Sequence, residues 1–461
     1  MKFSHIYLIV SLLFAVFASQ ACGQGGVSSS SFGVARSGIH NRFGAYVMPP
    51  PDLFRVEEFV NYHRHDLPLP DEDQRIRLDV QQMSLGSGKK LVQLGITTPR
   101  ALDTETMQPL NIVLVIDDSG SMRGEKMEQL KESLHAIIAR FRESDRVTIV
   151  GFDNRSRLVL PATKKTNHRK IRDAINSITA DGGTDLHAGL MMGFREAQKN
   201  FDAERINRVI FLTDGNANVG ETHADEIAAE SKSCIEKGIS LVTIGLGVDF
   251  NNGLLRQIAD SGHGPMHFIG DAKDIRKTFV KEIDSLLAPA ASKVRLKIEL
   301  KKTRGVNVFG YEKNLKQVGD KLIFKLDDLN CGATQVVLAK VSADDLAGEA
   351  KLKYVDAITG KKVELVVDLA NVDAEPSRSL RRNYAISQVA WGIKSAAKRC
   401  QEHEPEEAVR KLESSLKRAE GFCDAEEDRH LRRVEKIARG YLKKLRPKLA
   451  EYRRHDLSWE D

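Results

Sequence analysis

Short apolar runs alternate with stretches of helical periodicity between residues 109 and 287. Consecutive apolar positions are typical of strands buried on both faces of a parallel sheet. The apolar runs cover 112–116, 147–152, 209–212 and 241–246, and the helical stretches include 125–142 and 186–200. Because strands and helices alternate along this segment, we predict a doubly wound, Rossmann-like α/β domain over 109–287.

Alternating apolar and polar positions, the pattern of half-buried strands, flank this domain on both sides. Two runs precede it, at 76–83 and 90–97, and Gly86-Ser87-Gly88 between them is typical of a hairpin turn. Six further runs predict a β-sandwich over 288–370; they lie at 294–300, 306–309, 321–326, 334–341, 350–354 and 362–367. The two early strands could complete its sheets and make the α/β domain an insertion. That hypothesis requires pairing between residues 76–98 and 293–368.

Helical periodicity also occurs near both ends of the chain. An apolar stripe follows Pro49 and predicts a helix at the start of a 49–108 segment: Leu53, Val56, Phe59 and Val60. Residues 371–461 are predicted to be a helical tail, in which Pro405 begins one helix and Gly421 ends it. The fold class is therefore multidomain, with α/β, β and α parts.

The first residues have the pattern of an export signal. Residues 1–21 join Lys2 to an apolar run that is too short to span a membrane, so we expect a removable signal peptide. Cys22 is a candidate for lipidation, and 22–48 begins as a Gly/Ser-rich, flexible tether. We expect an exported protein anchored by lipid in a bacterial cell envelope. A soluble periplasmic or secreted protein is the alternative.

Charge adds little to this picture. The net charge is +6, and residues 381–461 carry 20 Lys or Arg against 15 Asp or Glu. A solvated helix face explains this excess, and no aromatic residues interleave with it as they do in nucleic-acid platforms. We expect no nucleic-acid partner. The five cysteines have neither zinc-ligand spacing nor the pattern of a disulfide framework.

Oxygen-bearing side chains follow three of the predicted strands, in one case after an intervening helix. The segments are Asp117-Asp118-Ser119-Gly120-Ser121, Gly182-Gly183-Thr184-Asp185 and Thr213-Asp214-Gly215. In an open parallel sheet, ligands gather beyond the carboxyl ends of the strands, so these loops are expected to converge. Carboxylate and hydroxyl oxygens suit a hard cation. Taken alone, the first segment could instead cap the helix that begins near Glu125.

Together, the three segments resemble the metal-ion-dependent adhesion site of von Willebrand factor type A domains. The resemblance implies that Ser119, Ser121 and Thr184 bind the metal directly or nearly so, and that Asp117 and Asp214 act directly or through water. Mg²⁺ fits best, with Mn²⁺ or Ca²⁺ as alternatives. Asp118 and Asp185 are expected to face solvent or to fix loops. The segment after Pro49 also resembles a bacterial subfamily of the YfbK type.

The resemblance implies a recognition function, in which an Asp or Glu of a partner protein completes the metal shell. We therefore expect a metal-dependent protein-binding module that is not an enzyme. A structural envelope protein, whose metal only stabilises the fold, is the alternative. A Mg²⁺-dependent hydrolase is a third and weaker candidate. Dehalogenase-like phosphatases need a second acid two residues after the first, and here that position is Ser119.

Overall fold

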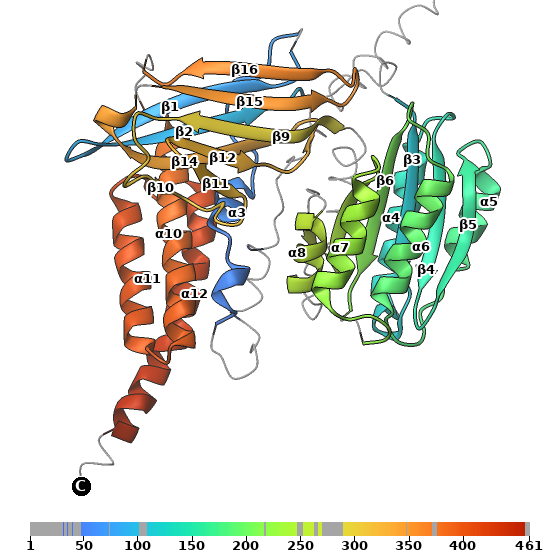
Figure 1. Ribbon diagram of the computed structural model, residues 1–461. Helices are drawn as coiled ribbons and strands as arrows, with labels where there is room; N and C mark the ends of the chain where they lie inside the picture. Colours follow the sequence, from blue (N-terminus) through green and yellow to red (C-terminus); the bar gives the residue numbers. More distant parts are fainter. Residues whose placement is uncertain are drawn as a thin grey trace, which may run out of the picture.

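The computed structural model describes residues 31, 35, 39, 48–72, 74–100, 108–215, 218–246, 252–261, 266–269, 289–346, 348–370 and 376–456. Figure 1 shows three parts: a β-sandwich, a group of long helices that extends from one side of it, and an α/β domain beside them. The predicted signal peptide and Cys22 lie outside the described residues.

The α/β domain is built on a six-stranded sheet with the order β5-β4-β3-β6-β7-β8. Five strands are parallel: β3 (Leu110–Asp117), β4 (Arg146–Phe152), β6 (Ile206–Thr213), β7 (Ser240–Leu246) and β8 (Met266–Ile269). Strand β5 (Ser156–Lys164) is antiparallel to β4 and forms one edge. The doubly wound domain predicted from the sequence is present, and β5 is an addition that the prediction did not contain.

Helices cover both faces of this sheet. Alternate side chains of β3 divide between two cores, with Leu114 in one and Val115 in the other. The first core includes α4 (Glu125–Ala139) and α5 (His168–Asn176). The second includes α6 (Leu186–Lys199), α7 (Ala224–Ile235) and α8 (Asn252–Ser261). A short 3-10 turn, η2 (Gly120–Met122), links β3 to α4.

The sandwich consists of two antiparallel sheets. The four-stranded sheet has the order β1 (Arg77–Gly86), β2 (Lys89–Thr97), β14 (Thr334–Ser342) and β10 (Asn307–Val308). The second has the order β11 (Leu315–Val318), β12 (Lys321–Lys325), β9 (Pro289–Glu299), β15 (Glu349–Asp356) and β16 (Lys362–Asp368), with β13 (Leu329–Asn330) also paired to β9. The turn η3 (Ala343–Asp345) leads from β14 toward β15. Residues of both sheets, such as Leu94 and Leu296, share one buried core.

The predicted pairing across the α/β domain is present. Strand β2 pairs along its whole length with β14, from Thr97 opposite Thr334 to Lys89 opposite Ser342. The chain therefore completes part of the sandwich before it enters the α/β domain and finishes the sandwich afterwards. Gly86 and Gly88 have φ angles of 79° and 67° at the β1–β2 turn, which glycine adopts without strain. This segment is a hairpin turn.

The C-terminal helices form a bundle under the four-stranded sheet. They are α10 (Arg378–Gln401), α11 (Pro405–Glu420) and α12 (Arg429–Asp456). Leu91 and Leu338 on the second face of that sheet share a core with all three helices and with α3 (Val56–Asn61), and η1 (Pro51–Leu53) lies against α10. The predicted tail is thus an integral layer of the fold. None of the helices in the described ranges is long and apolar enough to cross a membrane.

The predicted flexible tether over 22–48 is wrong at the positions that can be described. Ser31, Ala35 and Ile39 are helical and lie four residues apart. Ser31 and Ala35 are buried, and Ile39 packs against the core of the bundle. The Tyr441 hydroxyl donates a hydrogen bond to the carbonyl oxygen of Ala35 at 2.7 Å. The Gly/Ser-rich composition around residue 25 predicted a flexible segment. It did not indicate that Ala35 and Ile39, further along the chain, pack in the core of the bundle.

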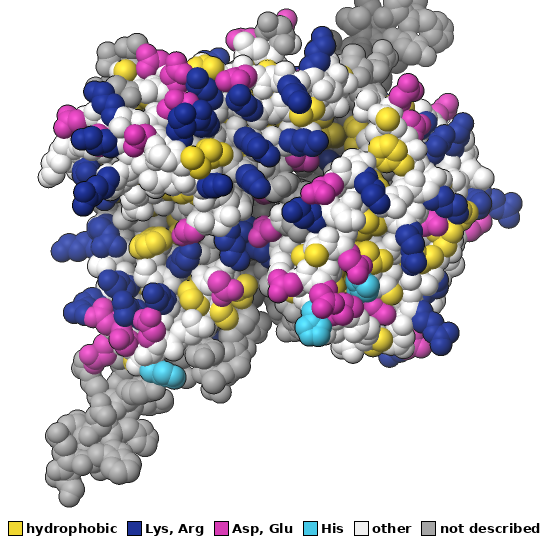
Figure 2. All heavy atoms as spheres, in the orientation of Figure 1, with side chains coloured by type: hydrophobic (Ala, Val, Ile, Leu, Met, Phe, Trp, Pro, Cys, Tyr) yellow, Lys and Arg dark blue, Asp and Glu magenta, His cyan; other side chains and the backbone are white. Residues whose placement is uncertain are grey.

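Lys and Arg side chains also gather away from the C-terminal helices. Figure 2 shows many of them over the region where Figure 1 places the sandwich. Arg295 lies directly opposite Lys325 on one side and Lys353 on the other. Lys353 pairs with Glu364 at 2.8 Å. The count of charged residues in the sequence suggested that the basic surface is confined to the C-terminal helices. The structure shows that basic side chains also gather on the sandwich.

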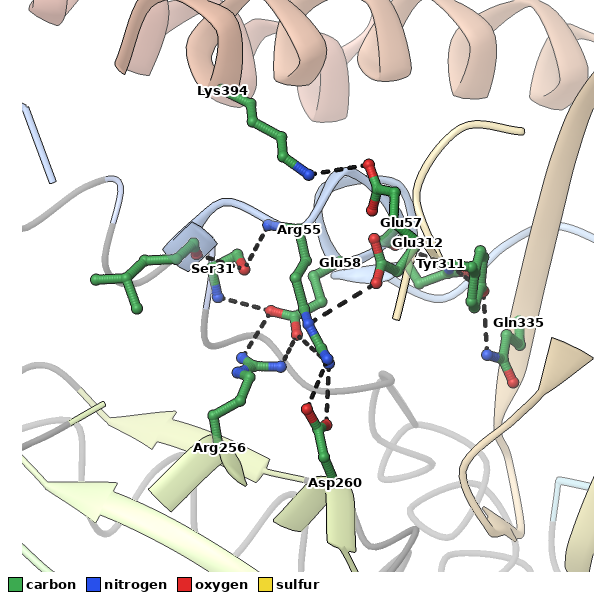
Figure 3. Close-up of polar contacts among 12 residues, drawn as sticks. Ser31, Arg55, Glu57, Glu58, Arg256, Asp260, Tyr311, Glu312, Gln335 and Lys394 are labelled. Atoms are coloured by element: carbon green, nitrogen blue, oxygen red, sulfur yellow. Dashed lines mark hydrogen bonds and ion pairs between the residues drawn. The ribbon is translucent and has the colours of Figure 1, made fainter. Parts of the chain in front are cut away.

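A buried group of ion pairs joins α8 of the α/β domain to the segment around α3. Figure 3 shows Arg256 and Asp260 pointing toward Glu58 and Arg55. The Arg55 guanidinium donates to both carboxylate oxygens of Asp260, at 3.1 and 2.7 Å. Arg256 donates to both oxygens of Glu58, which also accepts from the backbone N–H of Ser31 at 2.7 Å. Burial would raise the pKa of Glu58, but Arg256 and Arg55 outweigh it and lower that pKa.

Candidate metal centre

Asp117 is the last residue of β3, and its side chain is buried at the carboxyl edge of the sheet. One carboxylate oxygen, Oδ1, accepts a hydrogen bond from the Ser119 backbone N–H at 2.9 Å. The other, Oδ2, accepts from the Thr213 hydroxyl at the end of the neighbouring strand β6. Burial raises the pKa of Asp117 to about 6. The strand ends therefore hold this carboxylate in one fixed orientation.

Ser119 and Ser121 follow in the turn that contains η2. Their hydroxyl oxygens lie 3.0 Å apart, and the Ser121 hydroxyl donates to Oδ1 of Asp214 at 2.6 Å. The backbone N–H of Gly120 donates to the carbonyl oxygen of Gly182 at 3.0 Å, which ties this turn to the second loop. The first loop is thus connected to both of the others.

Thr184 reaches the same place from the loop before α6. Its backbone N–H donates to Oδ1 of Asn218 at 2.8 Å, so this loop is held by the chain that follows β6. A Cβ atom placed on Gly215 would lie 3.0 Å from Thr184 Oγ1 and 3.5 Å from Asp117 Oδ2. Glycine at position 215 therefore leaves room for these two oxygens to approach the same stretch of backbone. All five residues selected from the sequence lie at this edge.

Lys126 is a residue of the site that the sequence analysis missed. It lies in the first turn of α4, and its ammonium group forms an ion pair with Oδ2 of Asp214, whose side chain is fully buried. The same ammonium lies 3.3 Å from the Ser121 carbonyl oxygen. One sequence signal could have pointed to it, because a cation in the first turn of a helix opposes the helix dipole.

The neighbouring acidic residues hold the loops. Asp118 is fully buried and does not face solvent; its carboxylate pairs with Arg157, and its carbonyl oxygen accepts from the Asp181 N–H at 2.7 Å. Burial raises the pKa of Asp118 to about 7, although Arg157 opposes this shift. Asp185 caps α6 by accepting from the Ala188 N–H at 2.9 Å.

The helix-cap alternative for the first loop is wrong. Helix α4 begins after Gly124, which has no side chain, and no side-chain cap accepts a hydrogen bond at the start of this helix. Asp117, Ser119 and Ser121 instead direct their polar groups toward one another and toward the ends of other strands.

Comparison with known families identifies the domain that carries this edge. The profile of the von Willebrand factor type A domain matches residues 111–281, which include all three loops. Residues 111–281 are a von Willebrand factor type A domain. Domains of this family often take part in metal-dependent protein interaction or adhesion.

The von Willebrand A domain lies within longer similarities to curated proteins. YfbK of Escherichia coli is 30% identical over 299 residues, which cover 62% of this chain and 51% of that protein. Protein sll0103 of Synechocystis is 27% identical over 305 residues, which cover 63% of this chain and 72% of that protein. Human inter-alpha-trypsin inhibitor heavy chain H3 is 28% identical over 56% of this chain and 31% of its own length. This chain therefore spans about half of the length of YfbK.

A solved structure shares the arrangement beyond the von Willebrand A domain. The von Willebrand factor type A protein from Catenulispora acidiphila superposes with a TM-score of 0.53 and 15% sequence identity. The match covers 76% of this chain and 91% of that one. At this identity the likeness concerns the fold alone.

The donor set of the von Willebrand A domain suits a hard divalent cation. Asp117 and Asp214 supply two negative charges, and Ser119, Ser121 and Thr184 supply neutral hydroxyl oxygens. Over the described part of the chain, no group of three or more His, Cys, Asp or Glu residues could hold a metal. Carboxylate and hydroxyl oxygens are ligands that hard divalent cations accept.

Proposed function

We propose that the von Willebrand A domain holds a divalent cation, Mg²⁺ above all, and uses it to bind a carboxylate of a partner protein. The residues that would hold the metal are Asp117, Ser119, Ser121, Thr184 and Asp214. One observation carries the proposal: the Ser121 hydroxyl lies within hydrogen-bond distance of both Ser119 Oγ and Asp214 Oδ1. Oxygens of two loops that are 93 residues apart thus meet at one point.

The ligand chemistry follows from the composition of the site. Mg²⁺ prefers six oxygen ligands in octahedral geometry and usually retains water in part of its shell. Five protein side chains, some of which act through water, leave a position for an outside oxygen. An Asp or Glu side chain of a partner supplies such an oxygen. The bound metal would then attract this carboxylate by its positive charge and fix its orientation.

A recognition function is favoured over catalysis by the residues of the three loops. They contain no histidine or cysteine, and the serine hydroxyls interact with each other and with Asp214. A hydrolase would need a base beside a nucleophile or a metal-bound water. Asp117 receives two hydrogen bonds that fix it as a ligand, which leaves it poorly placed as a mobile base.

The first experiment measures metal binding directly. Isothermal titration with Mg²⁺ and Mn²⁺ is expected to give one site in the wild-type protein and none in Asp117→Asn. The matched control is Asp173→Asn, an exposed aspartate of α5 in the same domain, which should bind like wild type. Equal binding by wild type and Asp117→Asn would contradict the proposal.

The second experiment tests capture of a partner. Immobilised wild-type protein is incubated with a cell-envelope extract in Mg²⁺ or in chelator, beside Asp117→Asn. Proteins retained by wild type only in Mg²⁺ would support recognition through the metal. If Mg²⁺ raises the melting temperature but retains no partner, the structural alternative is favoured, because a ligand of the folded state alone stabilises it.

We also propose that the protein is exported and lipidated at Cys22. The support is the sequence before and after this residue, an apolar run ending in small residues and then Gly-Gln-Gly-Gly. Expression of the full chain in a bacterium with a labelled fatty acid should label wild type and leave Cys22→Ser unlabelled. An unlabelled wild-type protein found in the soluble periplasmic fraction would point to simple secretion.

A further inference from the structure

Lys126 forms a contact at the candidate metal centre that a metal-ligand motif does not require. Its ammonium group pairs with Oδ2 of Asp214, while Oδ1 of the same carboxylate accepts from Ser121. The Asp214 side chain is fully buried, whereas the Lys126 side chain is 32% exposed. The ammonium therefore reaches inward from the surface to a buried carboxylate.

Helix stability does not explain this lysine. The first turn of α4 also holds Glu125 and Glu128, the charge that a helix N-terminus favours. A lysine in this turn interacts unfavourably with the helix dipole. The same lysine at a later position of the helix would be less unfavourable. The gain that offsets this cost is the ion pair with Asp214.

We propose that Lys126 sets the charge of the metal centre, so that the metal-loaded site is cationic and selects an anionic ligand. This inference rests on the proposed metal site. Asp117 and Asp214 together carry −2, a divalent ion adds +2, and Lys126 leaves a net charge of +1. Asp118 lies outside this count, because its carboxylate pairs with Arg157, which Asp153 shares. Without Lys126 the loaded site would be neutral.

The same contact shapes the coordination. Because Lys126 occupies Oδ2, Asp214 faces the site through Oδ1 alone and cannot chelate a cation with both oxygens. The metal would then be held more weakly and would keep a position for an outside carboxylate. Lys126 thus lowers the affinity for the metal and raises the affinity of the loaded site for an anion. These two effects have opposite signs, which a merely structural residue would not produce.

The test uses the full chain with Mn²⁺ as the metal and acetate as the carboxylate. Lys126→Met keeps the apolar stem without the charge, Lys126→Arg keeps the charge, and Lys131→Met is the control further along the same helix, where Lys131 pairs with Glu128. Electron paramagnetic resonance of free Mn²⁺ gives the metal affinity. Water proton relaxation of bound Mn²⁺ reports acetate.

Removal of one positive charge a few ångströms from a divalent ion at a partly buried site should change both affinities by roughly tenfold. Lys126→Met is expected to bind Mn²⁺ about tenfold more tightly and, once loaded, to bind acetate about tenfold more weakly. Lys126→Arg should retain acetate binding, and Lys131→Met should match wild type. Circular dichroism confirms that each variant is folded.

The outcomes separate this inference from the proposed function. If wild type binds Mn²⁺ but Lys126→Met binds it no more tightly and loses no acetate, the role of Lys126 is rejected while the metal site stands. If wild type binds Mn²⁺ and no acetate, carboxylate capture is rejected, and tighter Mn²⁺ binding by Lys126→Met still supports the effect on metal affinity. If wild type binds no Mn²⁺, both proposals fail.

Discussion

At Thr184, the effect of one hydroxyl group on metal binding can be tested without a change to the surrounding fold. Its side chain is almost fully buried, and its position is fixed by the backbone hydrogen bond to Asn218. Thr184→Val keeps the branched shape and removes only the hydroxyl oxygen. We expect Mn²⁺ affinity to fall by about tenfold or more, since a buried metal would lose one oxygen ligand. Isothermal titration measures this, and a melting temperature close to wild type would show that the loop is intact.

Four of the five candidate metal-site residues could be selected from sequence because they lie within a few positions of the end of β3 or β6, and Thr184 was selected by the Gly-Gly-Thr-Asp segment before α6. Lys126 could not be assigned to the site from sequence. Its partner Asp214 is 88 residues away, and no local sequence pattern indicates the contact. The same limit applies to Asp118. Its place beside Asp117 did not reveal that Arg157, on the edge strand β5, reaches in and pairs with it.

His65 provides a pH-dependent test at the residue scale. It is buried between the sandwich and the helical bundle, where its Nε2 lies 3.1 Å from Asn61 Oδ1 and its ring 4.7 Å from that of His63. Burial, with Arg382 nearby, lowers the pKa of His65 to about 3. The unfolded chain, with an ordinary histidine pKa near 6.5, takes up this proton first as the pH falls. Stability is therefore lost from about pH 6.5 toward pH 3.

The expected loss from His65 is about 1.4 kcal/mol for each pH unit in that range. Between pH 6.5 and 5, wild type should lose about 2 kcal/mol more of its unfolding free energy than His65→Gln, which cannot titrate. Urea denaturation at the two pH values measures the difference. Parallel losses in the two proteins would show that His65 takes its proton in the folded state as well.

Helix α6 illustrates the scale of elements. It follows Thr184 and Asp185 directly, so its seat on the sheet positions the second metal-site loop. Two glycines, Gly189 and Gly193, bring it close to β3 and β4. A Cβ atom on Gly189 would lie 2.5 Å from Cγ of Phe152, and one on Gly193 would overlap a methyl group of Val115. Larger residues at these positions would push the helix off the sheet.

Gly193→Ala is therefore expected to destabilise the protein by about 1–3 kcal/mol through overpacking. This outweighs the higher helix propensity of alanine, which is worth about 1 kcal/mol. Chemical denaturation measures the change. The double variant with Val115→Ala provides the control, because the space left by valine should accommodate the new methyl group. Its loss of stability should be smaller than the sum of the two single losses, and additive losses would contradict the packing argument.

Elements with strong periodicity were predictable. Strands β3, β4, β6 and β7 and helix α11, with Pro405 at its start and Gly421 after its end, have the bounds that the pattern indicated to within a few residues, whereas the short strand β8 was not predicted. Strand β5 was missed although it contains the apolar run 158–160; Pro161 interrupts this run, and proline is tolerated there because β5 is an edge strand. The two-residue strand β13 is too short to have a period, whereas β10 lies within the strand predicted at 306–309.

At the scale of the whole molecule, the sequence indicated that strands on both sides of the von Willebrand A domain share a sheet, since both sets alternate and neither is a sandwich by itself. The layer beneath that sheet was not predictable. Helix α3 and the C-terminal helices meet on its second face from opposite ends of the chain. Apolar stripes show that helices are buried, and they do not say against what.

The ion pairs between α8 and α3 decide how firmly the von Willebrand A domain is held to the rest of the molecule. Glu58 and Arg256 are both buried, so Arg256→Met leaves a carboxylate without its main partner (Figure 3). Breaking a buried pair in this way costs about 3–5 kcal/mol. We expect this loss in denaturation, together with faster hydrogen exchange in α3 and α8. Glu58→Gln combined with Arg256→Met removes the stranded charge and should recover part of the stability.

The control is an exposed ion pair. Arg446→Met breaks the pair with Glu413 and should cost at most about 1 kcal/mol. If Arg256→Met costs no more than Arg446→Met, the domain is held by other contacts.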